Sequence, residues 1–108
     1  MIKHVVMWRM KALDPVQKKE DMNNIRKALL ALLQKVPSLH SIQVGVNENE
    51  LNVAYDLCLI TKHHDWEGLK AYQAHPAHQS VAGMIGGLTQ EKAVADFVFE
   101  EFFKEETA

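Results

Sequence analysis

The sequence contains a single cysteine, Cys58, among its 108 residues. One cysteine excludes an intrachain disulfide, and this is typical of the reducing cytoplasm, where we expect the protein. Charged residues interrupt the longest apolar runs, so we expect no signal peptide and no membrane-spanning helix. The formal net charge is only -2 with mixed signs, which predicts neither nucleic acid nor an anionic membrane as a partner.

Several motifs that carry chemistry are also missing. The chain has no glycine-rich phosphate loop, no nucleophile elbow and no paired catalytic cysteines. His75 and His78, together with His63 and His64, are the only grouping that suggests a metal, and no acidic residue is spaced to complete the set. We therefore expect no metal and no cofactor.

The residues that are present are sufficient for one folded domain. Hydrophobic residues make up 47% of the chain and charged residues 24%, which favours a packed core. Asp14-Pro15 is a typical helix start, and Pro37 should end the helix. Its buried stripe is predicted to contain Met22, Ile25, Leu29, Leu32, Leu33 and Val36. The other predicted strands span 2–11, 39–47, 51 or 53 to 61, and 92–102. The other predicted helices span 66–74 and 76–85, and Gly86-Gly87 should end the second of these.

This order, β-α-β-β-α-β, predicts an α+β ferredoxin-like fold. Two crossover units form a four-stranded antiparallel sheet with helices on one side, and the second helix is split at Pro76. The domain is predicted to span residues 1–103, and residues 104–108 should form a polar tail.

Both faces of the predicted sheet are apolar, although helices cover only one of them. The bare face carries either the set that includes Val5, Met7, Cys58, Ile60, Ala95, Phe97 and Phe99, or the set that carries Trp8, Leu57 and Leu59. Either patch exceeds the roughly 300–600 Å² that a monomer exposes. We predict that the first set is bare and is covered by a second copy, giving a homodimer with the sheets face to face. The alternative is a monomer with an exposed apolar face.

The segment from Ala71 to His78 is the strongest candidate for chemistry. Tyr72 and His78 flank the break at Pro76, so their side chains can converge on one pocket, and a phenol and an imidazole are enough for proton transfer. Asp96 lies in an apolar strand and needs a partner, for which His78 is the predicted one. His75 is expected to cap the following helix or to reach solvent. The alternative for Tyr72 and for the buried His4 is simple packing.

Five segments of the chain together resemble the stress-responsive dimeric α/β barrel family, called Dabb. The resemblance rests on residues 1–7, 37–45, 55–57, 71–78 and 93–97, and the Tyr-x-x-His-Pro-x-His motif that begins at Tyr72 is its most specific part. The resemblance implies a ferredoxin-like fold whose sheets pair into a barrel. Plant polyketide cyclases of this family use a tyrosine and a histidine that match Tyr72 and His78. The chain departs from them at Leu57, where they carry a histidine, and at Leu29, where they carry an aromatic hydroxyl.

The resemblance also implies a function and a pocket. We expect a cofactor-free cyclase, isomerase or lyase that acts on a small ketone-bearing molecule, with Tyr72, His78 and Asp96 as catalytic residues. A non-catalytic stress-response binding or scaffold protein is the alternative, and a cofactor-free monooxygenase is a further one. The residues expected to bind the substrate are His4, Val6, Trp8, Leu57, Leu59 and Val81.

Overall fold

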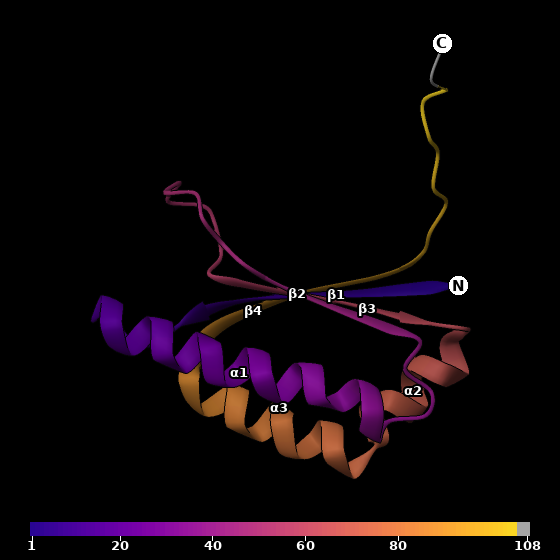
Figure 1. Cartoon of the computed structure of the whole chain (residues 1–108), viewed down its shortest axis with the longest axis horizontal. Helices are drawn as coiled ribbons and strands as arrows, with labels where there is room; N and C mark the ends of the chain where they lie inside the picture. The colour runs from indigo at the N-terminus through magenta and orange to yellow at the C-terminus, as the bar shows by residue number, and fades with distance from the viewer. Residues whose placement is uncertain (106–108) are drawn as a thin grey trace.

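The computed structural model describes residues 1–105 and has the predicted ferredoxin-like fold. Its elements are β1 (Ile2–Met10), α1 (Pro15–Lys35), β2 (Ser41–Val46), β3 (Leu57–His63), α2 (Trp66–Ala74), α3 (Pro76–Leu88) and β4 (Thr89–Val98). The four strands form one sheet in the order β2-β3-β1-β4, and each neighbouring pair is antiparallel. The three helices lie on one face of this sheet (Figure 1).

The central strand β1 shows which face the helices cover. Its even-numbered residues are buried and its odd-numbered residues are only half-buried, as the period of two in a strand requires. The predicted orientation is therefore confirmed, with His4, Val6 and Trp8 beneath the helices. Val94 lies on the same face, opposite Val6, but it is 50% exposed because β4 is an edge strand.

Helix α1 begins and ends close to the predicted residues. The Asp14 carboxylate accepts a hydrogen bond from the Gln17 backbone N–H at 2.9 Å, which caps the first turn. The core stripe consists of Ile25, Leu29, Leu32 and Val36, and Met22 packs against it. The prediction for Leu33 was wrong. This residue is 40% exposed because it lies at the edge of the stripe rather than on it.

The predicted start of the third strand at 51 or 53 was also wrong, because β3 begins at Leu57. Polar contacts hold the preceding residues outside the sheet. The Arg9 guanidinium donates hydrogen bonds to the backbone carbonyls of Ala54 at 2.9 Å and Val53 at 3.3 Å. The Asp56 carboxylate accepts a hydrogen bond from the Met10 backbone N–H at 2.7 Å. Residues 47–56 therefore form a loop whose carbonyl groups and Asp56 carboxylate accept hydrogen bonds from β1.

The predicted break between α2 and α3 at Pro76 is confirmed. His75 caps α3, since its Nδ1 accepts a hydrogen bond from the Ala77 backbone N–H at 3.0 Å. The predicted stop at Gly86-Gly87 was wrong, because α3 continues to Leu88 and neither glycine has a positive φ. The predicted end of the last strand at 102 was also wrong. Strand β4 stops at Val98, opposite Ile2, where β1 offers no further partner.

The sheet face away from the helices is apolar at its centre. Val5, Met7, Cys58 and Ile60 are half-buried there, and Phe97 is 42% exposed. The loop 47–56 and residues 99–105 extend on this same side (Figure 1). Of the predicted tail 104–108, residues 104–105 have no regular structure, and residues 106–108 lie outside the described residues.

No helix within residues 1–105 is both long and apolar enough to cross a membrane.

Candidate functional site

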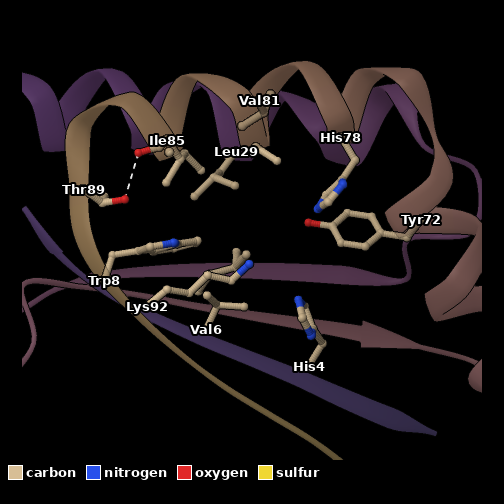
Figure 2. Close-up of a pocket in the computed structure, with 13 residues that line it drawn as sticks. His4, Val6, Trp8, Leu29, Tyr72, His78, Val81, Ile85, Thr89 and Lys92 are labelled. Carbon is tan, nitrogen blue, oxygen red and sulfur yellow. Dashed lines mark hydrogen bonds between the residues drawn. The ribbon is translucent and has the colours of Figure 1, made fainter.

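A cavity of about 140 Å³ lies between the helices and the covered face of the sheet. Residues of β1 and β3 form one wall, α1 and α3 form the other, and α2 contributes Tyr72 at one end (Figure 2). The residues that line the cavity are His4, Val6, Trp8, Leu29, Leu59, Tyr72, His78, Val81, Ala82, Ile85, Gly86, Thr89 and Lys92. A cavity of about 150 Å³ can hold benzene, so this one accommodates a ligand with a single ring or a chain of similar size.

Tyr72 places its hydroxyl in this cavity. The residue is 0% exposed, and within residues 1–105 its Oη atom has no hydrogen-bond partner. Figure 2 shows the hydroxyl pointing away from α2 into the cavity, between His78 and His4. Burial raises the pKa of Tyr72 to about 12, so the hydroxyl stays protonated at neutral pH. A protonated, unpartnered hydroxyl in this position can donate a hydrogen bond to a ligand.

His78 lies beside Tyr72, as the spacing around Pro76 predicts. The centroids of the two rings are 4.5 Å apart. His78 Nδ1 is 3.1 Å from the carbonyl oxygen of Gln73, and because a carbonyl only accepts, Nδ1 carries the hydrogen. Nε2 is then the basic nitrogen. Desolvation by burial and the nearby charges of His4 and Lys92 lower the pKa of His78, although the Gln73 contact opposes this, so the neutral form is favoured.

The predicted contact between Asp96 and His78 is not formed. Asp96 instead bonds to Nδ1 of His4, because the antiparallel register of β1 and β4 places these two residues directly opposite each other. Because Nδ1 of His4 is bonded to Asp96, the other ring nitrogen, Nε2, remains without a bond to Asp96. The imidazole of His4 lies on the side of the sheet that faces the cavity. Asp96 itself does not line the cavity. Its side chain contacts the site through His4.

Most of the residues predicted to contact a substrate line the cavity. His4, Val6, Trp8, Leu59 and Val81 all do so, whereas the sixth, Leu57, does not. Leu57 is buried in the core at the end of β3 where Trp8 pairs with it. A contact between Leu57 and a ligand in this cavity was therefore a wrong prediction.

Two residues near the site were missed. His63 is fully buried, its Nε2 lies 2.8 Å from the Thr61 hydroxyl, and its ring centroid is 4.9 Å from that of Tyr72. Because the predicted third strand stopped at Thr61, the alternation that places His63 on the covered face was overlooked. Lys92 lines the cavity because β4 sets it opposite Trp8. Within residues 1–105, no three His, Cys, Asp or Glu side chains converge to hold a metal.

The buried His63 and the half-buried His78 make stability depend on pH. Desolvation by burial lowers the pKa of both His63 and His78 in the folded protein. At a pH between these lowered pKa values and the unfolded pKa of about 6.5, the two histidines bind more protons in the unfolded chain than in the folded protein. The free energy of unfolding should therefore decrease as the pH falls below about 6.5. Urea titrations across this range should show a weaker pH dependence for His78→Gln. The same dependence in His78→Gln and in the exposed-site control His40→Gln would contradict the assignment.

Comparison with known families identifies the architecture. A family model described as the stress-responsive A/B barrel domain, Dabb, matches residues 2–99. The chain belongs to the Dabb family. A search of curated proteins finds no match.

Solved structures agree with this assignment of the fold. A dimeric protein of unknown function from Bacteroides fragilis has a TM-score of 0.81 and 26% identity, over 91% of this chain and 95% of that one. A second dimeric protein of unknown function, from Thermobifida fusca, has a TM-score of 0.78 and 21% identity, over 91% and 90%. A hydroxynitrile lyase from Passiflora edulis has a TM-score of 0.74 at 12% identity, over 95% and 96%. Likeness at such low identity shows the fold alone.

Proposed function

We propose that this Dabb protein is a cofactor-free enzyme that removes a proton alpha to the carbonyl group of a small ketone. The observation that supports this function best is the buried, unpartnered Tyr72 hydroxyl, directed into an apolar cavity beside a neutral imidazole. Proton removal of this kind begins both cyclisation by aldol addition and isomerisation. A lyase would use the same two side chains, Tyr72 and His78, for the reverse of the aldol addition.

The proposed step assigns one role to each of two side chains. The substrate carbonyl oxygen accepts a hydrogen bond from the Tyr72 hydroxyl, and Nε2 of His78 takes the proton from the alpha carbon. The electron pair of the broken C–H bond forms the carbon–carbon double bond of the enolate. The carbonyl π pair moves to the oxygen, where Tyr72 stabilises the negative charge. The imidazolium of His78 then returns the proton to the product.

Asp96 supports this site by holding His4. The pair fixes the imidazole of His4 on the cavity wall on the other side of the Tyr72 hydroxyl from His78, as Figure 2 shows for the two rings. In this arrangement Asp96 is a positioning residue. Its carboxylate orients His4 rather than the proposed base.

The cavity favours a small substrate. Leu29, Val81 and Ile85 line it from the helices and Val6 lines it from the sheet, so most of its wall is apolar. The volume of about 140 Å³ suits a single ring, and because the cavity is partly open, a short substituent can extend beyond it. A low-polarity wall also strengthens the hydrogen bond from Tyr72 to a developing enolate.

Exchange of hydrogen for deuterium tests the proposed step directly. Phenylacetone, a neutral ketone with one ring, is incubated with the protein in D₂O, and NMR follows the loss of its alpha protons. The proposal expects exchange above the rate in buffer. Binding of phenylacetone with exchange at the buffer rate would instead favour the non-catalytic binding protein. That alternative is supported by the fact that Asp96 engages His4 and leaves His78 without a carboxylate.

We also propose that the protein is a homodimer in which the bare sheet faces meet. The bare face carries the half-buried Val5, Met7, Cys58 and Ile60 and the 42% exposed Phe97, and a second copy would cover them. Residues 47–56 and 99–105 extend on this same side of the sheet (Figure 1). The related structures from Bacteroides fragilis and Thermobifida fusca are dimeric, which supports the same assembly here.

A further inference from the structure

Lys92 introduces a positive charge into a cavity whose wall is mostly apolar. In the antiparallel register Lys92 is opposite Trp8, so its side chain lies on the covered face of β4 and lines the cavity. Figure 2 shows this side chain extending from β4 along the cavity wall near Trp8 and Val6. Lys92 is exposed overall on the edge strand β4, so its methylene chain can cover apolar residues while its ammonium group brings a positive charge to the cavity.

The charge of Lys92 is not engaged by an acidic side chain within residues 1–105. The described ion pairs there involve Lys18 with Asp56, Lys70 with Glu67, Arg9 with Glu91, and His4 with Asp96. Glu91 precedes Lys92, but it faces the other side of the strand and pairs with Arg9. Asp96 is on the same face of β4 as Lys92, and it is bound to His4. The ammonium group is therefore available to a ligand.

Besides the imidazoles of His4 and His78 and the Thr89 hydroxyl, a ligand in this cavity can meet the Tyr72 hydroxyl and the Lys92 ammonium group. The Tyr72 hydroxyl comes from α2 and has no partner within residues 1–105, and the Lys92 ammonium comes from β4. Between them the wall is formed by apolar side chains of β1, α1 and α3, such as Val6, Leu29 and Ile85. This arrangement matches a molecule with an apolar body, a carbonyl oxygen for Tyr72 and a negative charge for Lys92.

We propose that Lys92 binds the carboxylate of the substrate, so that the protein acts on a small keto acid. This inference rests on the proposed function, in which Tyr72 binds the ketone oxygen. A carboxylate is the anion that fits, because a volume of about 140 Å³ leaves no room for a nucleotide beside an apolar ring. Lysine binds a carboxylate as a point charge, and because Lys92 is exposed, added salt should weaken the contact.

A matched pair of probes tests the charge preference. Benzoylformate carries a phenyl ring, a ketone and a carboxylate, and it has no alpha hydrogen, so it binds without reacting. Acetophenone has the same ring and ketone, with a methyl group in place of the carboxylate. NMR titrations should give a dissociation constant roughly tenfold lower for benzoylformate, and the difference should shrink as salt is added.

Three variants assign this preference to Lys92. Lys92→Gln should bind the two probes about equally, and Lys92→Arg should keep most of the preference because it keeps the charge. Lys27→Gln removes the same charge from an exposed position on α1 and should behave like the wild type. Equal affinities of the wild type for both probes, or a preference that persists in Lys92→Gln, would overturn the proposal.

A further measurement separates this proposal from the proposed function. Deuterium exchange into neutral phenylacetone requires Tyr72 and His78, but it does not require a carboxylate contact. Exchange without any preference for benzoylformate would refute the role of Lys92 and leave the proposed function intact. A preference for benzoylformate that depends on Lys92, without exchange, would refute the catalytic function and leave the anion site intact.

Discussion

Tyr72→Phe should reduce the rate of alpha-proton exchange by about 10²-fold or more, and His78→Ala should reduce it by at least as much. The tyrosine variant removes only the hydroxyl that would stabilise the enolate, and the histidine variant removes the base. NMR assays in D₂O with phenylacetone provide the rates. Rates like that of the wild type in both variants would end the proposal of catalysis at this site.

The tyrosine variant also separates a chemical role from a structural one. The Oη atom of Tyr72 is buried and has no hydrogen-bond partner within residues 1–105. Removing an unpaired buried hydroxyl should leave the free energy of unfolding unchanged or slightly higher. We therefore expect Tyr72→Phe to lose activity without losing stability, as measured by urea denaturation. A large loss of stability would indicate that the hydroxyl is part of the packing.

Two controls match these variants in chemistry and differ in position. Tyr55→Phe removes a hydroxyl from the other tyrosine, whose ring contacts Arg9 outside the cavity. His40→Ala removes an imidazole from an exposed position before β2. Both controls should retain the exchange rate of the wild type. A loss of rate in either would show that the assay reports on the stability of the fold and not on the site.

Val5→Glu should convert the proposed homodimer into a monomer of 12.3 kDa. Val5 lies at the centre of the bare face, where it pairs with Ile60 on β3 and Ala95 on β4. In a two-fold interface this substitution would bury two carboxylates close to each other, and burying unpaired charges is strongly unfavourable. Sedimentation velocity at micromolar concentration should show two chains for the wild type and one for the variant.

The matched control for this prediction is Gln34→Glu. It makes the same change in charge on the exposed surface of α1, on the other side of the sheet. The control should sediment as the wild type does. A wild-type protein that sediments as one chain would refute the dimer, and a Val5→Glu variant that remains dimeric would place the interface elsewhere.

Local patterns were sufficient to predict the fold and part of the site. The Asp14-Pro15 helix start, the break at Pro76 and the alternation in β1 each depend on neighbouring residues, and the structure confirms all three. The same break also brings Tyr72 and His78 together, with ring centroids 4.5 Å apart. The boundaries that were wrong depend on distant groups. Strand β3 begins late because Arg9 and Met10 bind the backbone and side chain of residues 53–56.

The sequence by itself determined the order of the elements, the covered face of the sheet and the meeting of Tyr72 with His78, because these follow from periodicity and from a proline that cannot continue a helix. Only the tertiary structure decided which imidazole receives the carboxylate and which cation enters the cavity. Both depend on the register of β4 against β1, which sets Asp96 opposite His4 and Lys92 opposite Trp8. A register joins residues about 90 positions apart, and no local pattern encodes it.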